Sequence, residues 1–259
     1  MGHIRLGELA RSRRWLQVVE LLKAGSGVED LAAATAHAAE TELENAKGDP
    51  AFAYTMWLLT QLPLAARSSQ FKERLGELGF DADADDSILS LVAGVSTAID
   101  RNVAGRANRT DLGELARQAA TETLSSILSV STPSLFGTTA EDVQRELSRL
   151  ATKDRFAKLA RDFFARLTQK TLEYYISREL PNHVGPGKSI SSFDQQIAFR
   201  EALNRHCREA SAIVETFSGG WYSKSNYEGT LNPDTAQRFA DYALTKMHDE
   251  LRARRSADG

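Results

Sequence analysis

Residues 156–167 read FAKLARDFFARL, and the spacing of their apolar side chains establishes the fold class of the chain. The apolar residues recur at intervals of three and four, which places them on one side of an α-helix and leaves the charged residues on the other. This stripe consists of Phe156, Leu159, Ala160, Phe163, Phe164 and Leu167. A similar stripe extends from Leu203 to Phe217. Both segments are therefore predicted to be amphipathic helices that pack against other helices.

The rest of the chain carries the same helical signals. Asp49-Pro50 and Asn232-Pro233 each place a capping side chain directly before a proline at the first position of a helix. No segment alternates polar and apolar residues as a half-buried strand does, and no Asn-Gly or Asp-Gly hairpin turn occurs. We therefore predict an all-α protein, a bundle of eight or nine amphipathic helices without a sheet. The expected helices span residues 13–24, 28–47, 50–67, 69–78, 86–104, 111–130, 139–178, 193–217 and 233–255, and a break of the seventh near Thr152 is an alternative.

Residues 129–138, SVSTPSLFGT, form the best candidate for a boundary between domains, because they are rich in small and turn-forming residues. They divide the chain into an N-terminal helical region, residues 1–130, and a C-terminal helical region, residues 139–259. A surface loop within one continuous domain is the alternative.

The composition favours a soluble cytoplasmic protein. Of the 259 residues 42% are hydrophobic and 26% are charged, as in globular proteins, and the net charge is only -3. A single cysteine excludes an internal disulfide and fits a reducing compartment. The N-terminal residues lack the apolar core of a secretory signal, and the most apolar run, residues 88–99, is too short and too polar to span a membrane. The abundance of alanine and arginine suggests a bacterial source.

An aromatic loop is expected after the second stripe, at residues 218–227, SGGWYSKSNY. Gly219 suits the left-handed position that ends a helix, and Gly220 gives the chain freedom to leave it sharply. The residues of the loop that could bind a partner are Trp221, Tyr222, Lys224 and Tyr227. Rings with polar groups beside a cation can stack on a base or on a side chain of another protein. Alternatively, Trp221 folds back on the preceding helix and fills the core.

A cationic helix face is the second candidate for partner binding. Its residues are Arg145, Arg149, Lys153, Arg155, Lys158, Arg161, Arg166 and Lys170. Only three acidic residues lie in the same stretch, and several of the cations lie opposite the apolar stripe. Such a face can bind phosphates or an acidic partner. It can equally be the solvated side of an amphipathic helix whose acidic partners lie elsewhere in the fold.

Arg200 and His206, separated by five residues, resemble the Arg-x4-6-His signature of the HEPN-type helical ribonucleases. Arg178 and His183, with four residues between them, give a second match. The resemblance implies a metal-independent endoribonuclease in which His206 transfers a proton and Arg200 stabilises the scissile phosphate. On the other hand, His206 falls between Leu203 and Ala210 on the apolar stripe, which predicts a buried histidine, and Pro181 predicts a helix end between Arg178 and His183.

Other common sites are not predicted. GPGKS at residues 185–189 lacks the first glycine of a phosphate-binding P-loop, because Asn182 stands at that position, and it lacks a preceding strand. The acidic residues 81–86 resemble the start of a calcium loop, but Asp86 replaces the required glycine. No spacing of histidine and cysteine indicates a metal site, and no motif indicates a cofactor.

The sequence therefore favours a cytoplasmic all-α interaction or adaptor protein over an enzyme. The partner would be a protein or a nucleic acid, bound through the aromatic loop and the cationic helix face. A HEPN-like ribonuclease of a toxin or phage-defence system is the first alternative, and a non-catalytic subunit that binds nucleic acid is the second. The oligomeric state is not predicted.

Overall fold

The protein is all-α, as predicted. The computed structural model describes residues 13–24, 27–38, 47–81, 87–106, 110–131, 139–183, 185 and 190–258, and within them it has eleven helices and no β-strand. In chain order the helices are α1 (Arg13–Ala24), α2 (Val28–Ala38), α4 (Pro50–Ala65), α5 (Phe71–Glu77), α6 (Ile88–Arg106), α7 (Asp111–Ser131), α8 (Ala140–Arg149), α9 (Lys153–His183), α10 (Phe193–Ala210), α11 (Ala212–Tyr227) and α12 (Pro233–Asp258).

The predicted number of eight or nine helices is wrong, because two expected helices are each divided. The first divides at residues 150–152 into α8 and α9, close to the break considered at Thr152. The second divides at Ser211, whose hydroxyl donates to the carbonyl of Arg208 at 2.9 Å. A side chain that bonds to the preceding turn competes with the regular helical hydrogen bonds, which accounts for a break there.

The helix starts predicted from capping residues are confirmed at two positions. The Asp49 carboxylate accepts hydrogen bonds from the amides of Ala51 and Phe52, both at 2.9 Å, at the start of α4. The side-chain oxygen of Asn232 accepts from the amide of Thr235 at 2.9 Å at the start of α12. Each cap satisfies amides that have no partner inside their own helix.

The helix that carries the stripe of residues 156–167 lies at the centre of the fold. Helix α9 packs against α7, α10 and α11, and every apolar residue of the stripe is buried. Two of its rings, Phe163 and Phe164, contact the ring of Phe52 on α4 with centroid distances of 6.2 and 6.1 Å. The stripe thus forms the core, as its spacing predicts.

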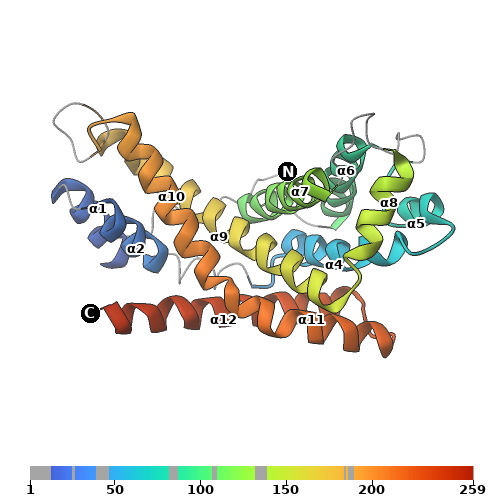
Figure 1. Ribbon diagram of the computed structural model, residues 1–259. Coiled ribbons are helices and arrows are strands. Elements are labelled where there is room, and N and C mark those ends of the chain that lie inside the picture. Colours follow the sequence, from blue (N-terminus) through green and yellow to red (C-terminus); the bar gives the residue numbers. More distant parts are fainter. Residues whose placement is uncertain are drawn as a thin grey trace.

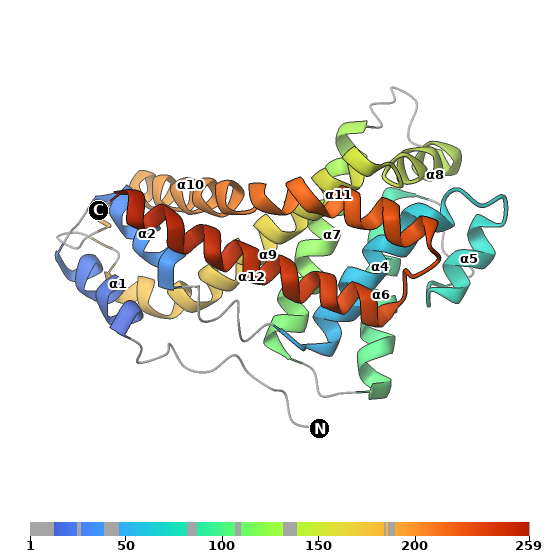
Figure 2. The ribbon, with the colours of Figure 1, turned by 90° about the horizontal axis from the view of Figure 1, so that it is seen from below.

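The other helices are arranged around α9 and α12, which extend between the two ends of the molecule (Figure 1). Helices α1 and α2 lie at one end, where α2 packs against α1 and α10, and helices α4 to α8 lie at the other end. Seen from below, α10 and α11 follow one another along one side, and α12 runs beside them (Figure 2). The buried apolar residues of all these parts form one hydrophobic cluster. The boundary proposed at residues 129–138 stays a prediction, and its residues 132–138 lie outside the described part of the chain.

None of the described helices combines the length and the apolar content that a bilayer-spanning helix requires.

Candidate functional site

The segment predicted to be an aromatic loop is helical instead. Helix α11 continues through Gly219 and Gly220 and ends at Tyr227, so the predicted left-handed helix end at Gly219 is wrong. Close packing, rather than a helix end, explains why a glycine stands at position 219. A Cβ atom at Gly219 would lie 2.4 Å from the carbonyl oxygen of Lys153 on α9, whereas a Cβ atom at Gly220 would meet nothing within 4 Å. Gly219 is therefore required by the close approach of two helices.

Tyr222 was predicted to bind a partner, but its side chain lies in the core. Its ring stacks on Phe156 with a centroid distance of 3.9 Å, and its hydroxyl donates to the carbonyl of Thr60 at 3.3 Å. Burial raises the pKa of its hydroxyl well above the ordinary value of 10. Because the residue is fully buried, its ring offers no surface to a partner in this structure.

Trp221 lies between the core and the surface. Its ring is half-buried and stacks on Phe239 of α12, with a centroid distance of 4.0 Å and an interplanar angle of 16°. This contact corresponds to the alternative in which the indole packs against the fold. Trp221 is nevertheless not covered completely, so part of it can still contribute to a surface.

An aromatic surface continues from Trp221 across α11 and α12. Phe217, one turn before Trp221, packs edge-on against Tyr242 with a centroid distance of 5.0 Å. The ring of Tyr242 is 49% exposed, and the ammonium of Lys246 lies 5.6 Å from its centroid. We call Phe217, Trp221, Tyr242 and Lys246 the aromatic strip. Sequence reasoning missed its α12 side, although the spacing of Phe239, Tyr242 and Lys246 by three and four residues places them near one face of a helix.

Lys224 and Tyr227 of the predicted loop lie near the C-terminal end of α11. Tyr227 is 92% exposed, and Lys224 is exposed with its ammonium 3.9 Å from the carboxylate of Glu228. Six residues along a helix separate Tyr227 from Trp221 by about 120° around the axis. Tyr227 therefore points to a different side of α11 than the aromatic strip.

The cationic face is largely compensated within the protein. Five of its eight residues form ion pairs: Arg145 with Asp142 at 2.9 Å, Arg149 with Glu146, Arg155 with Glu146 at 3.9 Å, Arg161 with Glu215 at 2.7 Å and Lys170 with Glu122 at 2.6 Å. The acidic partners belong to α7, α8 and α11. Lys153 and Lys158 are exposed, and neither forms an ion pair with the described residues. The face thus offers fewer uncompensated charges than the sequence suggested.

Arg200 and His206 both lie on α10, but they do not face the same way. Arg200 is exposed and His206 is half-buried. Six residues of continuous helix place them about 120° apart around the axis. Helix α9 extends through Pro181 to His183, so the helix end predicted between Arg178 and His183 is wrong, and those two side chains lie outside the described part. The ribonuclease hypothesis stays a prediction.

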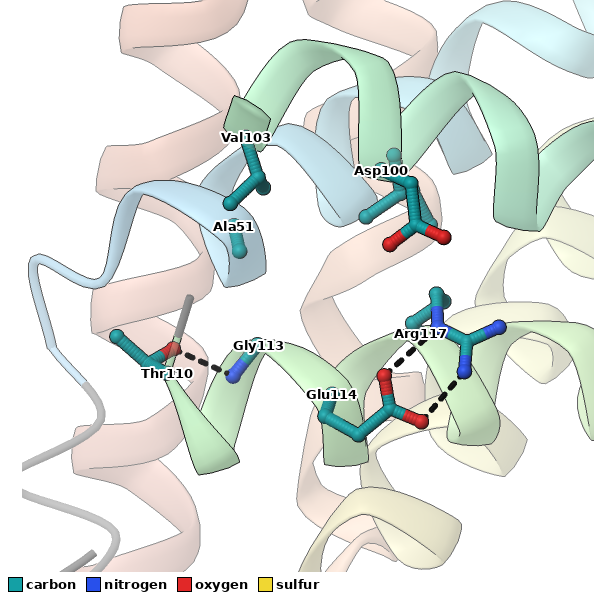
Figure 3. Close-up of a pocket in the computed structure, with 8 residues that line it drawn as sticks. Ala51, Asp100, Val103, Thr110, Gly113, Glu114 and Arg117 are labelled. Carbon is teal, nitrogen blue, oxygen red and sulfur yellow. Dashed lines mark hydrogen bonds and ion pairs between the residues drawn. The ribbon is translucent and has the colours of Figure 1, made fainter. Parts of the chain in front are cut away.

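A pocket that the sequence did not reveal lies between α4, α6 and α7 (Figure 3). Its volume is about 270 Å³, and it is lined by Ala51, Ile99, Asp100, Val103, Thr110, Gly113, Glu114 and Arg117. Helix α4 contributes the alanine, α6 contributes Ile99, Asp100 and Val103, and α7 contributes the last three residues. Thr110 lies directly before α7. Asp100 of α6 and Arg117 of α7 point toward the space between the two helices (Figure 3).

Arg117 is held in place by its own helix and by α6. Its guanidinium donates to both carboxylate oxygens of Glu114, with one of these bonds at 2.9 Å, and to the hydroxyl of Ser96 at 2.9 Å. The hydrogen bond with Glu114 raises the pKa of Arg117, and the charges of Glu114 and Asp100 raise it further. A Glu-x-x-Arg pair on a helix surface is common, so this pattern alone did not indicate a site.

The closed end of the pocket is built by two helix starts that support each other. The Thr110 hydroxyl accepts from the amide of Gly113 at 2.8 Å and donates to the Asp49 carboxylate at 2.7 Å. Asp49 thus caps α4 and also anchors the residue that caps α7. Gly113 permits this contact, because a Cβ atom there would lie 2.5 Å from the Cβ of Ala51.

Neither metal binding nor similarity to known proteins adds to this picture. No group of three histidine, cysteine, aspartate or glutamate residues suited to a metal ion occurs among the residues that the structure describes. No protein-family model, no curated protein and no solved structure matches the chain.

Proposed function

We infer that the chain is a helical interaction module that binds a protein partner through the aromatic strip on α11 and α12. The observation that carries this proposal is the half-exposed Tyr242, which is flanked by Phe217 and Lys246 on an otherwise well-packed helix pair. Aromatic side chains are enriched at protein interfaces, because they bury a large area at a small cost in conformational entropy. The proposal keeps the binding role that was expected for residues 218–227, but it assigns this role to a helix face instead of a loop.

The charges of the molecule favour a protein over a nucleic acid as the partner. Binding to a phosphate backbone requires several cations that are available to replace counterions. Most cations of the face around α9 instead hold carboxylates of the same chain. The net charge of -3 adds no attraction to a polyanion.

The packing beneath the strip makes it suitable for recognition. Trp221 stacks on the buried ring of Phe239, and α11 is held against α9 by the close contact at Gly219. Rings that are already ordered lose little freedom on binding, so more of the contact energy is available to the complex. The strip is therefore a preorganised surface.

A photo-crosslinking amino acid at position 242 tests the proposal in cells of the source organism. The matched control is position 89, where Leu89 is 78% exposed on α6. We expect a protein crosslinked from position 242 and not from position 89, and we expect Tyr242→Ala to lose the same protein in affinity purification. A crosslinked species that nuclease treatment removes would contradict a protein partner. Equal recovery of the partner by Tyr242→Ala would contradict the strip as its binding surface.

A further inference from the structure

The pocket between α4, α6 and α7 has two unlike walls. Ala51, Ile99 and Val103, which are only 2–7% exposed, supply a small area of hydrocarbon, whereas Asp100, Glu114 and Arg117 supply charge. A ligand suited to both walls must be apolar on its faces and polar on one edge. Small-molecule sites commonly combine an apolar lining with a few convergent polar groups in this way.

The pocket has room to enclose a single small ring system. Sites for drug-sized ligands occupy about 300–1,000 Å³. This pocket has about 270 Å³, and its closed end, where Gly113 meets Ala51, has no room for a further side chain. A six-membered or fused heterocycle is compatible with that volume, and any larger group attached to it would lie outside the pocket.

The polar wall defines the chemistry of the ligand's edge. A guanidinium has five N–H groups, and hydrogen bonds to Glu114 and Ser96 engage three of those of Arg117. Two N–H groups remain that can donate to an acceptor on a ligand. The Asp100 carboxylate extends from the opposite helix toward the same space (Figure 3). It already has an interaction within the protein, but a carboxylate has about four lone-pair sites and can therefore also accept from a donor on that ligand.

We propose that this pocket binds a small flat ring with a lactam or carboxamide edge, in which an N–H donor lies beside a carbonyl acceptor. The carbonyl oxygen accepts from Arg117, the N–H donates to Asp100, and the ring contacts the small accessible parts of Val103 and Ile99. Nucleobases such as uracil and hypoxanthine carry this edge, and so does nicotinamide. This site is separate from the aromatic strip, and its function does not depend on the proposed protein partner.

The test is a titration of the full-length, ¹⁵N-labelled chain with uracil, hypoxanthine and nicotinamide, followed by the amide resonances of residues 99–103 and 113–117. The matched negative probes are 1,3-dimethyluracil, which keeps the ring and lacks the N–H, and toluene, which has no polar edge. We expect at least one of the three amide-bearing ligands to shift these resonances and to bind at least about tenfold more tightly than either negative probe, since a lost hydrogen bond leaves its partner unsatisfied.

Two variants connect binding to the pocket. Val103→Phe fills the space and should abolish the shifts. Arg117→Lys keeps the positive charge but lacks the forked donors, so it should weaken binding about tenfold. If Val103→Phe fails to fold, Arg117→Lys alone decides the outcome. The proposal is overturned if no probe shifts these resonances at ~5 mM, which is a generous limit for a ligand of this size. It is also overturned if dimethyluracil or toluene binds as tightly as the amide-bearing ligands, or if Arg117→Lys binds those ligands with unchanged affinity.

Discussion

The two adjacent glycines of α11 provide the sharpest test of the packing, because they differ only in what surrounds them. A methyl group at Gly219 would meet the carbonyl oxygen of Lys153 at 2.4 Å, whereas the same group at Gly220 would point into open space. Both residues lie inside one helix. We therefore predict that Gly219→Ala destabilises the protein and that Gly220→Ala stabilises it.

The magnitudes follow from two opposing terms. Alanine is favoured over glycine inside a helix by about 0.5–1 kcal/mol, and both variants gain this term. At Gly219 the new methyl must be moved by about 1 Å to reach an ordinary contact of ~3.5 Å. Forcing extra volume into a packed contact costs typically about 1–3 kcal/mol. The net loss for Gly219→Ala is then at most about 2.5 kcal/mol, and the net gain for Gly220→Ala is about 0.5–1 kcal/mol, so the two variants differ by about 1–3 kcal/mol.

Thermal and urea unfolding of the two variants measure this difference. For a chain of this size each kcal/mol changes Tm by roughly 2–4 °C, so the two variants should differ by at least ~2 °C and by as much as ~12 °C. Gly220→Ala is the matched control for Gly219→Ala, because it adds the same methyl group to the next residue of the same helix. If Gly219→Ala stabilises the protein as much as Gly220→Ala does, α9 and α11 do not approach as closely as the structure shows, and the explanation of Gly219 is refuted.

Four further predictions address other contacts. Trp221→Ala should lower the free energy of unfolding by about 2 kcal/mol, because the stacking on Phe239 is lost. Tyr242→Ala should change it by less than about 0.5 kcal/mol. Equal effects of the two variants in urea unfolding would contradict the assignment of Trp221 to the packing and of Tyr242 to the surface. Because the pKa of Tyr222 is raised in the folded protein, its protonated hydroxyl contributes to the free energy of unfolding. This contribution is fully present below pH 10, the ordinary pKa of tyrosine, and is lost as the pH rises above that value. Urea midpoints should therefore fall more steeply above pH 10 in the wild type than in Tyr222→Phe. Asp49→Ala should cost about 1–2 kcal/mol, and a double-mutant cycle with Thr110→Val should give a coupling of at least ~0.5 kcal/mol, whereas additive effects would contradict the shared cap. Purified wild-type protein and His206→Ala should both leave RNA intact in EDTA, and cleavage by the wild type alone would support the ribonuclease hypothesis instead.

Periodicity predicted the elements of this fold better than it predicted their ends. The stripe on α9 is buried throughout, and the capping residues Asp49 and Asn232 mark the starts of α4 and α12. These features depend on residues close together in the sequence. The break at Ser211 and the continuation of α9 through Pro181 were not predicted by the local rules for helix starts and ends.

The candidate site shows the same limit more strongly. By local rules, two adjacent glycines after an apolar stripe indicate a helix end. Gly219 is instead required by its close contact with the carbonyl of Lys153, which is 66 residues away in the sequence. Likewise, the charges around α9 are compensated by Glu122 and Glu215 from other helices. Pairings of this kind are invisible without the fold, because any of the chain's acidic residues could have supplied them.

The close contact at Gly219 also explains why α11 presents aromatic residues to one side. The face of α11 toward the interior carries Val214, Ser218, Gly219, Tyr222 and Ser225. All of these residues except Tyr222 are small or medium in size. A helix that approaches α9 so closely leaves no room for large side chains along most of that face. Phe217 and Trp221 must therefore lie at its flank, where they meet Phe239 and Tyr242 of α12. The aromatic strip is thus a consequence of the tight helix pair, and a change that separates α9 from α11 should disturb partner binding even though it touches no residue of the strip.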